Sequence, residues 1–211
     1  MIKDSLLFIS LVLLLSSTNV NAQTDLRFGV KGGLNLATFS SGDLSNPTLT
    51  ARYHAGVYGR VPLPLMLSLQ AEALYSLKGT TIEETFGHNK VNGDIELGYV
   101  DVAAIINFKI LKAILLQGGF TLGVITSSDV KNNSDTQGNI NLEQVLQENN
   151  FNDLDPGYLL GIEFDIKRLS LGFRYTHSLD NIITDVSYPG FPEIRNTVYQ
   201  SYMGFRLTKS K

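Results

Sequence analysis

The sequence predicts an all-β fold, an eight-stranded antiparallel up-and-down transmembrane β-barrel. Eight stretches alternate apolar and polar residues with a period of two, as expected for strands that have one apolar face. The links between these stretches are alternately short and long, which is typical of outer-membrane barrels with tight turns at one rim and long loops at the other. Charges of both signs on the polar faces nearly cancel, which indicates an interior ion-pair network.

The strands are expected, in chain order, near 27–37, 52–61, 65–78, 95–109, 113–125, 158–167, 169–178 and 197–207. Each has a polar face, marked in that order by Lys31, Arg60, Glu72, Asp101, Gly119, Glu163, Arg174 and Arg206. The third strand is the clearest, because Ser68, Gln70 and Glu72 alternate there with apolar residues. Short turns are predicted at 62–64, 110–112 and 167–168, and long polar links at 38–51, 79–94, 126–157 and 179–196.

The composition excludes several modes of stabilisation and binding. The chain has 211 residues, a net charge of −3 and no cysteine, so neither a disulfide framework nor a cysteine-linked lipid anchor is available. No clustered basic stripe is present, so nucleic acid is not expected as a partner. We expect a single barrel domain over residues 23–211.

The first 22 residues have the pattern of a signal peptide. Lys3 precedes an apolar run from Leu6 to Leu15, and Val20-Asn21-Ala22 then supplies a small-residue cleavage site. The apolar run is shorter than the ~20 residues that a membrane-spanning helix needs. Export with cleavage after Ala22 is therefore predicted.

Alternation alone fits either a membrane barrel or a soluble lipid-binding barrel of the lipocalin type, which would bury its apolar face. A basic residue that faced lipid would cost about 2 to 4 kcal/mol at the midplane, so the charged face should line the lumen of a membrane barrel. Glycines recur on that same face, as expected where space is scarce. The expected lumen network consists of Lys31, Arg60, Glu72, Asp101, Lys109, Glu163, Asp165, Arg174 and Arg206.

Aromatic residues on the apolar face fall near strand ends, as in the interfacial girdles of membrane barrels. The tyrosines lie at the long-link ends and are Tyr53, Tyr75, Tyr158, Tyr175 and Tyr199. The phenylalanines lie at the short-turn ends and are Phe28, Phe108, Phe164 and Phe205. The residues between them are mostly Val, Leu, Ile and Ala, which would form a lipid-facing belt.

Several of these segments resemble the PorT-like outer-membrane β-barrel family. They are Phe28–Asn35, Tyr99–Val102 with Asn107–Lys109, Gln117–Phe120, and Leu171–Tyr175 with Leu179–Ile182. The resemblance implies an exported, porin-like barrel, and a namesake member is associated with protein secretion across the outer membrane. Two departures are Ala103, where many members have proline, and a C-terminus that continues past Phe205-Arg206-Leu207.

Candidate chemistry is sparse. His54, His88 and His177 belong to no recognisable triad motif, so we expect neither an enzyme nor a cofactor. Residues 133–144 have the oxygen-ligand spacing of a calcium loop, but Gln144 stands where a bidentate Glu is expected, which favours an ordinary external loop. Tyr188 and Phe191 could contact a partner from the last long link.

The sequence thus predicts a protein of the bacterial outer membrane with a largely filled lumen, acting in envelope anchoring or in loop-mediated interaction. A narrow channel or an accessory of protein secretion is one alternative, and a soluble exported lipid-binding barrel is another. Expected partners are outer-membrane lipid and lipopolysaccharide, the barrel assembly machinery, and a possible protein bound by the external loops.

Overall fold

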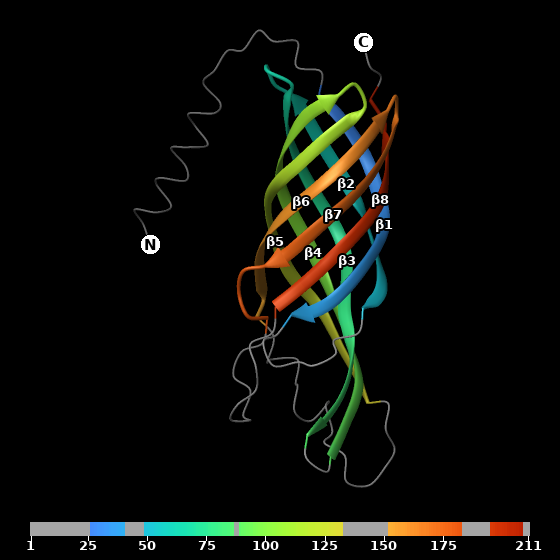
Figure 1. Ribbon diagram of the computed structural model, residues 1–211, viewed down its shortest axis with the longest axis vertical. Coiled ribbons are helices and arrows are strands. Elements are labelled where there is room, and N and C mark those ends of the chain that lie inside the picture. The colour runs from blue at the N-terminus through green and yellow to red at the C-terminus, as the bar shows by residue number, and fades with distance from the viewer. Residues whose placement is uncertain (1–25, 41–48, 87–88, 133–151, 183–194, 209–211) are drawn as a thin grey trace, which may run out of the picture.

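The computed structural model describes residues 26–40, 49–86, 89–132, 152–182 and 195–208. They form a closed barrel of eight strands in sequence order, with the first strand paired to the last (Figure 1). Every neighbouring pair is antiparallel, and this confirms the predicted fold class. The predicted signal peptide, the calcium-like segment 133–144, and Tyr188 and Phe191 lie outside the described residues.

The strands are β1 (Arg27–Ser40), β2 (Thr50–Pro62), β3 (Leu67–Phe86), β4 (Asn89–Leu111), β5 (Ile114–Asn132), β6 (Leu154–Ile166), β7 (Leu169–Ser178) and β8 (Arg195–Arg206). Tight turns join β2 to β3, β4 to β5 and β6 to β7 at one rim, which we call the short-turn end. The ends of β1 and β8 nearest the two chain termini also lie there (Figure 1). The opposite rim is the long-link end.

The turn between β2 and β3 differs from the prediction, which began the strand at residue 65. Leu65 and Met66 instead occupy the turn with φ values of 61° and 65°, and the amide of Leu67 donates to the carbonyl of Pro64 at 3.4 Å. Two central residues with positive φ suit the right-handed twist of a hairpin. The turn is usually marked by Asn or Gly, so the apolar pair gave no signal in the sequence. A smaller correction applies to 110–112, because β4 continues to Leu111.

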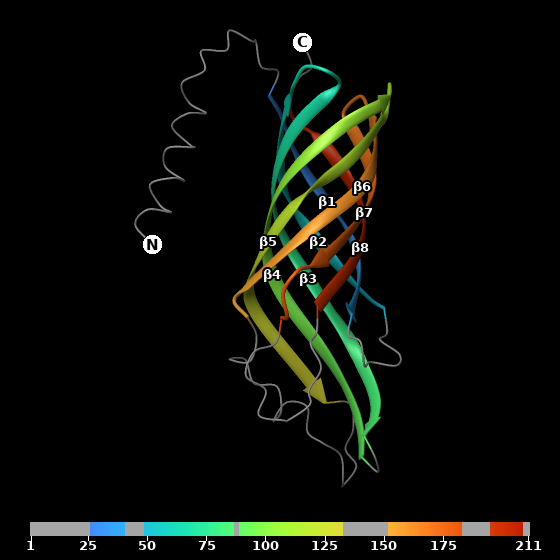
Figure 2. The same cartoon turned by 60° about the vertical axis from the view of Figure 1, so that its left-hand side comes forward.

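The predicted long link 79–94 was wrong, because β3 and β4 continue as one paired hairpin from Gly79↔Glu96 to Phe86↔Asn89. β5 likewise extends to Asn132, well into the predicted link 126–157. β2 pairs with β3 only as far as Ser76, and β6 pairs with β5 only as far as Val124. Three strands therefore project beyond the barrel as a sheet, which we call the β3–β5 extension (Figure 2). The parts of β3 and β5 in the extension, residues 79–86 and 126–132, lack the regular alternation that identified the other strands.

The barrel wall is apolar outside and largely polar inside. Leu69, Val102 and Leu160 are exposed on the exterior, whereas Glu72, Asn107 and Arg174 are buried in the interior. Some apolar side chains are also buried, such as Ile105 inside the wall and Ile95 and Leu97 on the β3–β5 extension. A soluble barrel of the lipocalin type would have the reverse arrangement. In the described part of the chain, no helix is long and apolar enough to cross a membrane.

Candidate functional site: the lumen network

The centre of the lumen is organised around Glu72. The Lys31 ammonium donates to its Oε1 at 2.6 Å, and Arg174 donates to Oε2 at 2.8 Å and to Oε1 at 3.1 Å. The side chains of Lys31, Glu72 and Arg174 are 1%, 0% and 2% exposed. A buried carboxylate needs such partners, because moving an unpaired carboxylate out of water costs several kcal/mol.

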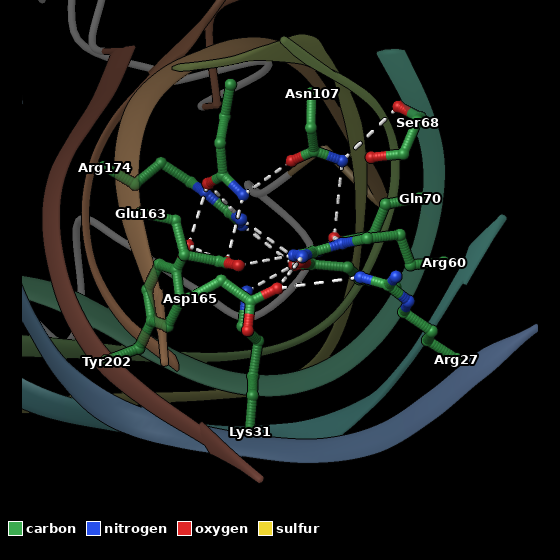
Figure 3. A network of polar contacts seen from close by, with 12 residues as sticks. Arg27, Lys31, Arg60, Ser68, Gln70, Asn107, Glu163, Asp165, Arg174 and Tyr202 are labelled. Carbon is green, nitrogen blue, oxygen red and sulfur yellow. Dashed lines mark hydrogen bonds and ion pairs between the residues drawn. The ribbon is translucent and has the colours of Figure 1, made fainter. Parts of the chain in front are cut away.

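A second set of ion pairs lies nearer the short-turn end. Arg60 donates from Nη2 to Glu163 at 2.5 Å and from Nη1 to Asp165 at 3.3 Å (Figure 3). Arg27 Nη1 lies 3.9 Å from Asp165, closer to the rim. The two sets together contain four cations and three carboxylates, so one positive charge is in excess; the cations are Arg27, Lys31, Arg60 and Arg174, and the carboxylates are Glu72, Glu163 and Asp165.

Neutral side chains join the two sets into one continuous structure, the central network. Gln70 accepts from Arg60 Nε at 2.5 Å and donates to Glu72. On the other side, Gln117 accepts from Arg174 at 3.0 Å and donates to Glu163 at 3.1 Å. The central network therefore fastens β1, β2, β3, β5, β6 and β7 to one another across the lumen.

Tyr202 on β8 completes the central network. Its hydroxyl lies 2.8 Å from Glu163 Oε2 and 2.8 Å from Gln117 Oε1, and the Lys31 ammonium stands 3.6 Å from the centre of its ring. Gly172 on β7 makes room for this ring, since a Cβ there would collide with it. Gly29 likewise leaves space for Tyr58, whose Cε1 would lie 2.6 Å from an added Cβ. At these two positions, the missing side chain of a lumen glycine leaves the space that an interior tyrosine ring occupies.

A separate group, the long-link cluster, lies toward the other end of the lumen. Lys78 donates to Asp101 at 2.8 Å and lies 3.8 Å from Asp155, with its ammonium 4.0 Å from the centre of the Tyr99 ring. Asn196 donates to Asp155 at 2.9 Å. Asp101 was expected in the same network as Glu72, but the structure places it in this cluster.

Two further residues that were expected in the network lie outside both the central network and the long-link cluster. Lys109 is exposed at the short-turn end, and Arg206 is buried nearby, yet neither lies within 4 Å of a carboxylate in the described part of the chain. Four other lumen residues were not predicted from the sequence, namely Lys78, Tyr58, Tyr99 and Tyr202. Their positions have the parity of neighbouring lumen residues, so strict counting along each strand would have found them.

The aromatic residues expected in girdles lie on the exterior. Tyr53, Tyr75 and Tyr199 are exposed, and Tyr158 and Tyr175 are partly covered because their rings pack together, with centroids 6.2 Å apart. The four phenylalanines of the short-turn end, Phe28, Phe108, Phe164 and Phe205, are also exposed. Phe120 and Phe173 are further exterior aromatic residues, outside the predicted girdles.

The contacts of the carboxylates and histidines favour a structural role for these side chains. Glu72 and Glu163 both have cations and amide or hydroxyl donors around them, so neither is open to act as a general base. His54 is buried against the Asn35 amide oxygen at 2.7 Å, and His177 lies 2.9 Å from the Thr197 hydroxyl. Within the described ranges, no group of three or more His, Cys, Asp or Glu side chains could hold a metal ion.

Comparisons with known proteins place this barrel among outer-membrane proteins. Residues 21–184 match the family described as "Outer membrane protein beta-barrel domain". No curated protein matches the chain.

Solved structures with a similar fold include Ail of Yersinia pestis, at 11% identity and TM-score 0.44, covering 86% of this chain and 98% of that one. OprG from Pseudomonas aeruginosa is similar at 13% identity and TM-score 0.46, covering 89% of this chain and 98% of the other. Neisserial surface protein A is similar at 13% identity and TM-score 0.48, with 85% and 97% covered.

Proposed function

Since this chain belongs to the outer membrane protein beta-barrel domain family, we propose that it is a non-conducting membrane barrel that holds its long-link end outside the cell for contact with a partner. The observation that carries the proposal is the filled centre of the lumen. Lys31, Glu72 and Arg174 meet there with side chains at most 2% exposed, and Gln70, Gln117 and Tyr202 occupy the space around them. A solute path would require this charge-paired layer to open.

The β3–β5 extension supports the proposed contact with a partner at the long-link end. It continues the sheet beyond the level at which β2 and β6 stop pairing with it, so it is a paired, projecting platform. The link that contains Tyr188 and Phe191 begins after β7 and ends before β8, at this same end of the barrel. We assign the exterior girdles to contact with outer-membrane lipid and lipopolysaccharide.

Orientation can be tested by cysteine labelling, because the native chain has no cysteine. Ser127→Cys on the extension and Lys167→Cys in a short turn would be compared on intact cells with a membrane-impermeant maleimide. The proposal expects labelling of S127C alone, and labelling of both after the outer membrane is permeabilised. Labelling of K167C alone on intact cells would overturn the orientation.

Planar-bilayer recording tests the closed lumen. The proposal expects no steady conductance from the wild-type protein. A steady conductance that changed when Arg60 or Glu72 was neutralised would instead support the narrow channel.

The finer assignment to the PorT-like family, with a role as an accessory of protein secretion, rests on sequence motifs. It would be supported if deletion of the protein stopped the export of secreted proteins while membrane integrity was retained.

A further inference from the structure

A basic pocket of about 190 Å³ opens at the short-turn mouth of the lumen. Its charged walls are Arg27, Arg60, Lys109, Lys112 and Asp165, from the ends of four strands and the β4–β5 turn. The pocket lies at the opposite end of the barrel from the β3–β5 extension. It is therefore independent of the proposed contact at the long-link end.

The pocket carries uncompensated positive charge. Arg60 pairs with Glu163 at 2.5 Å and with Asp165 at 3.3 Å, and Arg27 lies 3.9 Å from Asp165. These two arginines and two carboxylates neutralise one another. Lys109 and Lys112 line the same space without an ion pair to any described carboxylate, which leaves two positive charges at the pocket.

The charge of the surrounding rim acts in the same direction. The described turns at this end contain Lys112, Lys167 and Arg168 and no Asp or Glu. A mouth with an excess of one sign of charge concentrates ions of the opposite sign and accelerates their arrival. Anions of the compartment that faces this rim would therefore be drawn toward the pocket.

We propose that this pocket binds a phosphate group, either free or as a phosphomonoester. A phosphate carries about −1.5 to −2 charges near pH 7, which matches the two lysine charges. It also offers three or more acceptor oxygens to three separate donors, the Arg27 guanidinium and the two lysine ammoniums, whereas a carboxylate offers two. Leu63 and Met66 form an apolar wall beside these donors, against which the carbon skeleton of an ester can pack.

Two sources of this chemistry are available at a membrane surface, a soluble phosphate compound and the headgroup of a lipid. The test uses the whole mature chain labelled for amide NMR, with the signals of Met66 and Ala113 as reporters. The first arm titrates inorganic phosphate into protein in an uncharged detergent, with acetate at equal ionic strength as the competitor anion. The second arm compares nanodiscs of phosphatidylcholine with nanodiscs that also contain phosphatidic acid, a phosphomonoester lipid.

The proposal expects saturable shifts at Met66 and Ala113 with phosphate and not with acetate. K109Q/K112Q should weaken binding by about tenfold for each lysine removed, the usual effect of losing a charge-assisted contact. The matched control K167Q/R168Q removes the same amount of charge from the same rim outside the pocket, and it should retain the wild-type affinity. A faster-migrating band before boiling would show that both variants are folded.

The two arms of the test distinguish a lipid headgroup from a soluble phosphate compound. Shifts with phosphatidic acid nanodiscs identify the lipid headgroup as a source, and shifts with inorganic phosphate alone identify a soluble compound. The proposal is overturned if neither arm shifts the reporters, if acetate shifts them equally, or if K109Q/K112Q binds phosphate as well as K167Q/R168Q does.

Discussion

Two arginine–carboxylate pairs of nearly equal length stand at different depths of this barrel. Arg174 Nη1 lies 2.8 Å from Glu72, with side chains 2% and 0% exposed. Arg52 Nη2 lies 2.9 Å from Asp94 at the long-link end, with side chains 17% and 30% exposed. Water screens the second pair and is excluded from the first, so their contributions to stability should differ severalfold despite the similar distance.

The buried pair also differs in what surrounds it. Glu72 is bonded to Lys31, Arg174 and Gln70, so loss of one member leaves the others charged or polar in the lumen. Arg52 contacts Asp94 and also Glu96 at 2.7 Å, but these groups can turn to water when a partner is lost. The lumen network is therefore best described as a set of mutually dependent charges.

The largest effect is expected from Glu72→Ala. It leaves Lys31 and Arg174 buried without their carboxylate, which should lower the free energy of unfolding by about 3–5 kcal/mol. Urea titration of the protein folded in lipid vesicles would measure the loss. The double variant E72A/K31M restores the wild-type net charge of the lumen and should lose less than E72A alone. An equal loss in both would show that the uncompensated charge of Lys31 is not what destabilises E72A.

Tyr202→Phe should have the next largest effect. The substitution keeps the ring over Lys31 and removes only the hydroxyl that lies 2.8 Å from Glu163. Loss of a hydrogen bond to a charged group costs about 1.5–3 kcal/mol. The same urea titration applies, with Tyr199→Phe on the exterior as the matched control, for which little change is expected.

Gly172→Ala tests the close fit of the network. Its Cβ would overlap the Tyr202 ring, and forcing a methyl group into a packed interior costs about 1–3 kcal/mol. Combining it with Tyr202→Leu should make the alanine nearly neutral, since the overlapping ring is then gone. Full additivity of the two losses would show that the ring does not require this glycine.

Much of this arrangement could be predicted from the sequence, because a strand in a membrane wall must place its charges on one side. The parity of Lys31, Glu72 and Arg174 was sufficient to assign them to the lumen. Their pairing was not predictable, since Arg174 and Glu72 are 102 residues apart and meet only because the barrel closes. The extension was missed because its β3 and β5 parts, residues 79–86 and 126–132, do not alternate regularly between apolar and polar residues.

The smallest effect is expected from Arg52→Ala. Its partners Asp94 and Glu96 are 30% and 39% exposed, and pairs of this kind contribute about 0.2–1 kcal/mol. Raising the salt concentration should remove most of that contribution at Arg52, because screening acts on solvent-exposed charges, and should leave the loss caused by Glu72→Ala almost unchanged. Urea titrations of both variants at low and high salt would measure this contrast. Equal salt sensitivity at the two sites would mean that water reaches Glu72, and the filled lumen on which the closed-barrel proposal rests would then be wrong.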